Sequence, residues 1–272
     1  MGDSTASTAQ ETFGEKNAKH FDKVAPGEWP RWIVDLQQQI VDFLVSPDFP
    51  SWAGLDVNAQ AQAQGSKGRM LDYACGDGLL SKALKPLYAS VIGVDVSGAM
   101  LDKYRATASG LGLTDEEMMG VRGDFITGAS QATEPPLPEE ALSDFDMVAM
   151  SMALHHVEDA AATMRELVSR LKVGGKILIV DWAPLDGSTA AQREYQEELR
   201  KDNKEAIVKE RLAVHAARHT VGKPEGFTEA EQKLLFEQAG CKGFAWKLAD
   251  KLSYVEPVDA KGQLYWALAT KA

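Results

Sequence analysis

The chain has 272 residues, 44% of them hydrophobic, and a formal net charge of −11 at pH 7. This length and composition fit a globular chain of one domain with additions, and they exclude a chain too short or too polar to bury a core. The acidic balance argues against a nucleic-acid partner, because nucleic-acid binding normally depends on a basic surface patch.

The two cysteines, Cys75 and Cys241, are too few for a disulfide framework, which favours a reducing, cytoplasmic setting. No apolar run approaches the roughly 20 residues that cross a bilayer, so no membrane partner is expected. Residues 1–11 are rich in Ser, Thr and Ala and lack the basic and apolar regions of a signal peptide. We expect them to form a disordered tail.

Residues 12–68 are expected to form N-terminal helices and a connector. Apolar residues recur at helical spacing over 12–45, and Asn58–Gly68 has the Ala, Gln and Gly content of a flexible connector. Trp29 and Trp32 have two interpretations, packing against the core or a lid over a bound substrate. The prominence of aromatic residues in cores favours packing when these residues are taken alone.

The stretch Arg69–Leu84 has the pattern of a strand, a glycine loop and a helix. The strand runs into Asp72, and Gly76 and Gly78 give the loop a backbone that a ligand can approach closely. A second apolar strand ends at Asp95, about 20 residues on, which is the spacing of a carboxylate that reaches a ribose. This pattern predicts a nucleotide-like ligand at the carboxyl edge of a parallel sheet. It lacks the third glycine of a dinucleotide fingerprint, which disfavours a dehydrogenase.

Three more strands are predicted at residues 118–121, 145–151 and 176–182, and their alternation with helices predicts an open parallel sheet with right-handed crossovers. Asp124 and Phe125 follow the third strand and could bind an adenine, although an ordinary loop Asp and a core Phe are the alternative. A charged helix is expected from about 190 to 217. The last two strands, Phe244–Tyr254 and Gln263–Thr270, are expected to form an antiparallel pair.

Five segments occur in a characteristic order, namely Leu71–Gly78, Val94–Ser97, Gly123–Phe125, Ala153–Val157 and Leu171–Gly175. Together they resemble the class I S-adenosylmethionine (SAM)-dependent methyltransferases, in the branch that includes ubiquinone and menaquinone biosynthesis enzymes. One departure is Ala74, where that family more often has glycine. The resemblance implies an α/β fold with an open, doubly wound, mostly parallel seven-stranded sheet and an antiparallel last strand. This methyltransferase domain would span residues 69–272, with N-terminal helices added to it.

The resemblance also implies that SAM is the cofactor and S-adenosylhomocysteine (SAH) the product, with no metal. The residues expected at the cofactor are Asp72, Ala74, Cys75, Gly76, Gly78, Asp95, Val96, Met100, Asp124, Phe125 and Ser151. Asp95 is expected to hold the ribose hydroxyls, and Met100 to pack on the face of the adenine opposite Phe125.

The implied reaction is transfer of a methyl group from SAM to an oxygen, nitrogen, sulfur or carbon atom of a small molecule. His155 and His156 are the candidate bases, because an imidazole titrates near neutral pH, with helix capping or core packing as the alternative. Residues 184–224 are expected to form a lid-like insertion. Substrate-contacting candidates outside the core fold are Trp29, Trp32, Tyr195, His215 and His219, although packing is the more ordinary role of the last three.

A SAM-fold binding or scaffold protein, or a SAM-dependent catalyst of another reaction, is the competing function. A measurement of SAM binding would distinguish a cofactor-free scaffold, which does not bind SAM, from a methyltransferase or another SAM-dependent catalyst. The acceptor and the oligomeric state do not follow from the sequence.

Overall fold

A computed structural model of the chain describes residues 12–55, 68–126, 133–218 and 221–272. The expected tail at 1–11, nearly all of the expected connector at 58–68, and His219 lie outside these described residues. No helix in the described ranges is long and apolar enough to cross a membrane.

The centre of the molecule is a mixed sheet in the order β3-β2-β1-β4-β5-β8-β6, with β7 paired to β8 off this path. The strands are β1 (Arg69–Tyr73), β2 (Ser90–Asp95), β3 (Met118–Arg122), β4 (Phe145–Ser151), β5 (Leu171–Ala183), β6 (Cys241–Leu248), β7 (Ser253–Val255) and β8 (Ala260–Lys271). Strands β1 to β5 pair in parallel, whereas β8 is antiparallel to both β5 and β6. The predicted fold class, including the antiparallel strand near the edge, is confirmed.

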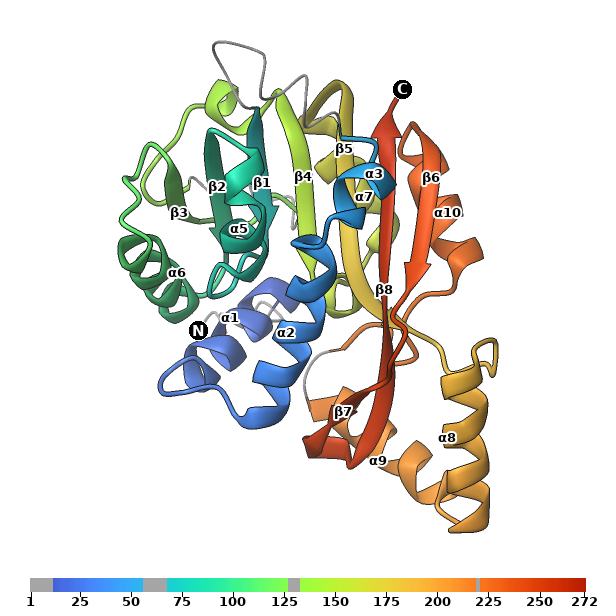
Figure 1. Cartoon of the computed structure of the whole chain (residues 1–272). Helices are drawn as coiled ribbons and strands as arrows, with labels where there is room; N and C mark the ends of the chain where they lie inside the picture. The colour runs from blue at the N-terminus through green and yellow to red at the C-terminus, as the bar shows by residue number, and fades with distance from the viewer. Residues whose placement is uncertain (1–11, 56–67, 127–132, 219–220) are drawn as a thin grey trace, which may run out of the picture.

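Helices cover both faces of this sheet (Figure 1). The α-helices of the described ranges are α1 (Phe13–Val24), α2 (Arg31–Leu44), α3 (Asp48–Trp52), α5 (Leu79–Leu84), α6 (Gly98–Gly110), α7 (Ala160–Ser169), α8 (Ala190–Lys201), α9 (Glu205–Arg218) and α10 (Glu229–Gln238). Short 3-10 turns are η1 (Lys85–Leu87), η2 (Glu139–Leu142), η3 (Leu154–His156) and η4 (Glu256–Val258).

The core has two layers because successive strand residues face opposite sides of the sheet. Leu71, Val148 and Ile177 lie in one row across β1, β4 and β5, and all three are 0% exposed. They belong to the cluster that packs under α7 and α10. Their neighbour Met70 faces the other cluster, which contains buried residues of α2, α3 and α5.

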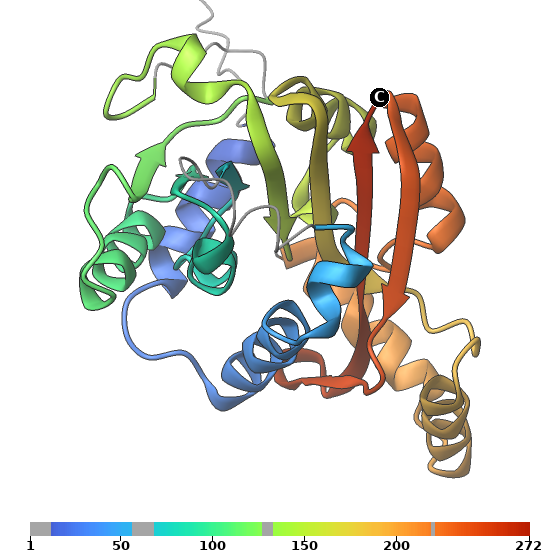
Figure 2. The same ribbon diagram turned by 45° about the horizontal axis from the view of Figure 1, so that its top comes forward.

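Two groups of elements lie at the carboxyl ends of the parallel strands, at the lower side of Figure 1. Helices α1 and α2 lie below β1 to β4, and β7, α8 and α9 lie below β5 and β8. Figure 2 shows that α8 projects away from the sheet, whereas α2 lies against it. Gln39 of α2 donates to the carbonyl of Lys251 at 2.7 Å, just before β7, which ties the two groups together.

Three expectations about element boundaries were wrong. The single helix expected over 190–217 is two helices, because Asn203 adopts a left-handed conformation with φ 56°. The strand expected at Phe244–Tyr254 is divided into β6 and β7, which raises the strand number to eight. Strand β5 begins at Leu171, earlier than predicted, because that residue already pairs with Phe145.

Candidate active site

The glycine loop joins β1 to α5 and has three residues with positive φ, Ala74 (55°), Gly76 (54°) and Gly78 (87°). A Cβ on Gly78 would lie 3.0 Å from Met118 and Tyr104 side-chain atoms, and this tight space together with the φ of 87° favours glycine there. A Cβ on Gly76 would meet nothing within 4 Å. The backbone at Gly78 therefore packs closely against the protein, whereas the backbone at Gly76 faces open space. A ligand can approach the loop closely at Gly76.

Asp95 at the end of β2 holds this loop. Its Oδ2 accepts the N–H of Gly76 at 2.8 Å, and its Oδ1 accepts that of Ser97 at 2.9 Å. The residue is 8% exposed, and burial raises the pKa of its carboxyl group. Because each carboxylate oxygen can accept a second hydrogen bond, the predicted ribose contact is compatible with both of these bonds.

Asp72 at the end of β1 is turned toward α5. Its Oδ2 accepts the backbone N–H of Ser81 at 3.0 Å and the Ser81 hydroxyl at 2.7 Å. The residue is 1% exposed, and burial raises its pKa from 3.8 to about 7. The structure gives Asp72 a role in holding the first turn of α5 under the loop, and direct contact with a cofactor stays a prediction.

The raised pKa of Asp72 predicts a pH-dependent stability. Between about pH 4 and 7 the folded protein holds a proton that the unfolded chain has released, so the stability contributed by Asp72 is present below this interval and lost as pH rises through it. We expect the melting temperature of the wild-type protein to rise by roughly 5–11 °C more than that of Asp72→Asn between pH 8 and 5, since the two pH units between 7 and 5 correspond to about 2.7 kcal/mol and 1 kcal/mol shifts a chain of this size by roughly 2–4 °C. Circular dichroism at several pH values measures this, and parallel curves for the two proteins would contradict it.

A cavity of about 340 Å³ lies between α1 and the ends of β2 and β3. It is lined by Thr12, Gly14, Glu15, Ala18, Val96, Arg122, Gly123, Asp124 and Glu134. Two predicted cofactor residues, Val96 and Asp124, therefore face the same space, directly beside Asp95. Met100, which is predicted to pack on the adenine, is buried in the first turn of α6. Ser97 caps this helix by accepting the Met100 N–H.

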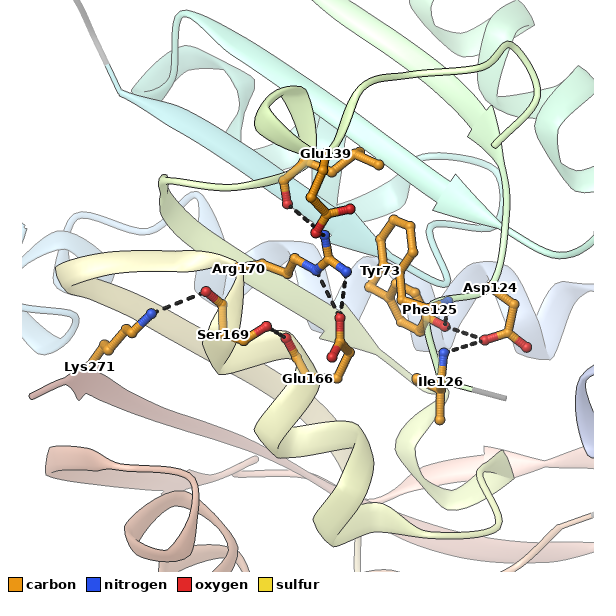
Figure 3. Close-up of polar contacts among 10 residues, drawn as sticks. Tyr73, Asp124, Phe125, Ile126, Glu139, Glu166, Ser169, Arg170 and Lys271 are labelled. Atoms are coloured by element: carbon orange, nitrogen blue, oxygen red, sulfur yellow. Dashed lines mark hydrogen bonds and ion pairs between the residues drawn. The ribbon is translucent and has the colours of Figure 1, made fainter. Parts of the chain in front are cut away.

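Tyr73 holds the side chain of Asp124 by a hydrogen bond (Figure 3). The Tyr73 hydroxyl donates to Asp124 Oδ1 at 2.9 Å and accepts the N–H of Phe125 at 3.3 Å. The ring of Phe125 lies 5.5 Å from that of Tyr73, under the guanidinium of Arg170, and does not line the cavity. Adenine stacking on Phe125 stays a prediction, and the contacts seen here are those of packing.

Arg170 completes this support. It is 12% exposed and pairs with Glu166 at 2.6 Å and with Glu139, while its guanidinium lies 4.7 Å from the centre of the Phe125 ring. Figure 3 shows how these residues hold the segment after β3 against the end of α7.

The contacts of Tyr73 predict a modest effect on cofactor binding. Tyr73→Phe removes the hydroxyl that orients Asp124 but keeps the Asp124 carboxylate itself, so we expect only about 2- to 10-fold weaker binding of SAH. Tyr88→Phe is the matched control, because Tyr88 is also buried but follows η1, at the opposite end of β1. Calorimetric titration with SAH compares the two variants, and equal affinities would show that Tyr73 does not act on this site.

The N-terminal helices contact the loop through polar side chains. Trp29 Nε1 and Gln37 Nε2 both donate to Asp77 Oδ2, at 2.6 and 3.0 Å. Asp22 of α1 accepts the hydroxyl of Ser97 at 2.6 Å. The ammonium of Lys103 lies 4.2 Å from the centre of the Trp29 indole. Trp29 thus joins the loop to α6, and the structure brings this predicted lid residue to the cofactor side of the site.

Two further predicted residues lie in the loop itself and at the end of β4. Cys75 is a loop residue with a buried side chain, and burial raises the pKa of its thiol. Ser151 ends β4, and its hydroxyl has no hydrogen-bond partner among the residues that the structure describes. A buried hydroxyl without a partner is unusual, so Ser151 is suited to a polar ligand atom at the switch point between β1 and β4.

His155 and His156 lie in η3, just after β4. His155 Nδ1 is 2.6 Å from Asp181 Oδ1, on the neighbouring strand β5. The two imidazole rings are 4.2 Å apart, and the ring of Phe21 from α1 meets His156 edge-on at 5.7 Å. Helix α1 therefore spans from the cavity beside Asp95 to the histidines.

The remaining substrate candidates are not gathered at the loop. Trp32 packs against the core cluster of α2 and α3. Tyr195 in α8 is buried, and its hydroxyl accepts the N–H of Lys261 in β8. His215 lies in α9, which with α8 forms the group below β5 and β8 (Figure 1). A substrate role for these three residues stays a prediction, as does that of His219 outside the described residues.

Sequence reasoning missed Asp181 and the Asp77 contacts. An acidic residue at the end of the apolar segment Lys176–Val180 is a signal that could have pointed to Asp181, since a charge in a buried strand requires a partner. Asp77 stands between Gly76 and Gly78 in the sequence. Its hydrogen-bond partners Trp29 and Gln37 are 48 and 40 residues away, so these contacts had no local signal.

Comparison with known proteins agrees with this arrangement. A protein family described as "Methyltransferase domain" matches residues 53–244, more than half of the chain. The crystal structure of magnesium protoporphyrin IX methyltransferase from Synechocystis PCC 6803 with bound SAM has a TM-score of 0.59 at 16% identity and covers 97% of this chain and 99% of that chain. The chain therefore belongs to this methyltransferase family and has the class I SAM-dependent methyltransferase fold.

Two curated relatives share the central part of the chain. An uncharacterized methyltransferase of Schizosaccharomyces pombe is 30% identical over 112 residues, which are 41% of this chain and 38% of that protein. Ubiquinone biosynthesis O-methyltransferase of Pseudomonas paraeruginosa (strain DSM 24068 / PA7) is 32% identical over 126 residues, 46% of this chain and 49% of that protein. The chain spans less than half of the length of these relatives.

Proposed function

We propose that the protein transfers a methyl group from SAM to a nucleophilic atom of a small molecule, leaving SAH. The observation that carries the proposal is the cavity of about 340 Å³ at the carboxyl edge, which Asp124 and Val96 line beside the loop-bound carboxylate of Asp95. In open α/β sheets this edge is where ligands bind.

The residues at this edge fit SAM. Asp95 retains acceptor capacity for two ribose hydroxyls, and Asp124 offers a carboxylate to an adenine amino group. The hydroxyl of Ser151, which has no partner among the described residues, is available to the amino-acid part. Two acidic residues at the loop, Asp77 and Asp95, also favour a cationic ligand.

The chemistry that SAM supplies when bound is an activated methyl group on a sulfonium. The protein's own contribution is to hold the acceptor in line, to exclude water and, where the acceptor carries a proton, to remove it. His155 and His156 are the residues proposed for the last role. This proposal is supported by their position directly after β4, the strand that pairs with β1.

A small acceptor is proposed because the described elements cover the edge from two sides. Helix α1 crosses from the cavity to the histidines, where the side-chain amide of Asn17 donates to the carbonyl of His156 at 3.2 Å. The segment before α10 crosses over η3, where the N–H groups of Gly222 and Lys223 donate to the carbonyl of His155 at 2.8 and 3.2 Å. Covers of this kind leave a concave site, which suits a small molecule.

A cytoplasmic location is part of the proposal. Cys75 and Cys241 are both buried free thiols. Unpaired thiols of this kind are typical of a reducing compartment.

Binding of SAH to the purified protein is the first test. At 100 times its dissociation constant, SAH should stabilise the fold by about 2.7 kcal/mol, and a thermal-shift measurement detects this. ATP and NAD serve as controls that share the adenosine. Stabilisation by SAH but not by the controls is expected, and equal stabilisation by all three would favour a general nucleotide-binding protein.

A further inference from the structure

At the carboxyl edge of the sheet, a carboxylate of β5 is joined to a histidine of η3, the turn after β4. Asp181 in β5 is 0% exposed, and its Oδ1 lies 2.6 Å from His155 Nδ1. The same side chain accepts the backbone N–H of His155 at 3.1 Å and that of Trp182 at 2.7 Å. One buried carboxylate therefore fixes both the ring and the backbone of His155.

These contacts determine which ring nitrogen carries the proton. The two backbone partners of Asp181 are N–H donors, so its carboxylate serves as an acceptor and the neutral His155 ring is protonated on Nδ1. The lone pair then lies on Nε2, which makes no hydrogen bond within the described part of the chain. The side chain of His155 keeps 10% of its surface exposed.

We infer that Asp181 is a positioning residue that holds His155 with Nε2 as the base for a hydroxyl-bearing acceptor. This inference rests on the proposed methyl transfer and adds the class of acceptor. His155 Nε2 takes the hydroxyl proton while an electron pair of the acceptor oxygen forms the bond to the methyl carbon. The electron pair of the broken carbon–sulfur bond stays on sulfur, which gives a methyl ether, SAH and an imidazolium that later releases its proton to water.

The surroundings of His155 leave this role to Asp181. The ring of His156 lies tilted at 4.2 Å from that of His155. Tyr265 pairs with Asp181 across β5 and β8, where burial and then the Asp181 charge raise the pKa of the tyrosine hydroxyl. Lys223 donates its backbone N–H to the carbonyl of His155, whereas its ammonium is paired with Glu225 and Glu231. Among the described residues, Asp181 alone is hydrogen-bonded to the ring, and its charge would stabilise the imidazolium.

The tautomer of His155 can be measured without turnover. In the ¹⁵N-labelled full-length protein at pH 8, with and without SAH, the histidine ¹⁵N shifts should show His155 protonated on Nδ1, with His155→Gln used for assignment. A proton on Nε2 would overturn the inference. This measurement uses the wild-type chain, so it decides the matter even where a variant fails to fold.

Replacement of Asp181 tests whether this residue sets the tautomer of His155 or only stabilises the fold. Asp181→Asn keeps one acceptor oxygen but turns an amide toward an N–H donor, so we expect a mixture of His155 tautomers. Asp159→Asn is the matched control, because Asp159 also accepts a backbone N–H near η3 but only caps α7. The control should retain the wild-type tautomer. A pure Nδ1–H tautomer in folded Asp181→Asn would show that Asp181 does not set it.

Turnover provides the second readout. With a phenol as acceptor, kcat of Asp181→Asn should fall about 100-fold or more, the range of general-base catalysis. With the thiol of the same skeleton it should fall less than about 10-fold, because thiols lose their proton more readily. Equal losses with both acceptors would mean that Asp181 acts only through structure. Failure of wild-type protein to bind SAH would instead count against the proposed function, whatever the tautomer.

Discussion

Replacement of Asp95 by alanine is expected to weaken SAH binding by about 10- to 150-fold, which corresponds to a charge-assisted hydrogen bond of about 1.5–3 kcal/mol. The carboxylate accepts the N–H groups of Gly76 and Ser97, so its loss removes the proposed ribose partner and also releases the loop from α6. Titration calorimetry with SAH measures the effect, after circular dichroism has shown that the variant is folded.

Two further variants make this prediction specific. Asp95→Asn retains an acceptor oxygen and should lose less affinity than Asp95→Ala. Asp102→Asn, in the helix that Ser97 caps, changes an exposed carboxylate that pairs with Arg105, and it should bind SAH as the wild type does. Unchanged affinity in folded Asp95→Ala would remove the ribose assignment.

A chain that begins at Pro30 is expected to fold but to lose methyl transfer by about 100-fold or more, the scale at which a misplaced reacting group slows catalysis. Helix α1 contains no buried residue, so its removal leaves the core intact. It does line the cavity, and Asp22 and Trp29 contact the start of α6 and the loop. The truncation therefore removes the cover of the site rather than its framework.

Removal of residues 1–11 alone is the control for this truncation, because it keeps all of α1. Circular dichroism and turnover with an identified acceptor are measured on both shortened chains. Full activity in a folded chain beginning at Pro30 would show that α1 and Trp29 serve only as packing, and the lid proposal would be wrong.

Much of the sheet could be predicted because its signals are local. The glycine loop, the carboxylate of Asp95 and the cap of Ser97 each follow from a few adjacent residues, and the structure places all three together. The break at Asn203 was also local, since Asp and Asn favour turns, and it could have been found.

The contacts that complete the site could not be predicted in the same way. Trp29 reaches Asp77, and Asp181 reaches His155, only after the strands and N-terminal helices are assembled. The contacts of Phe125 have the same origin. Its ring packs against Tyr73 and under Arg170, residues 52 and 45 positions away along the chain, whereas the predicted adenine stacking on this ring stays a prediction.

Transfer of a labelled methyl group tests the central proposal most directly. The full-length protein is incubated with SAM that carries a deuterated methyl group and with a metabolite extract, and small molecules are compared by mass spectrometry with an Asp95→Ala reaction. The account predicts a small molecule that gains the labelled methyl group only with the wild-type protein. Binding of SAM without label on any small molecule, or label on protein or nucleic acid instead, would contradict it.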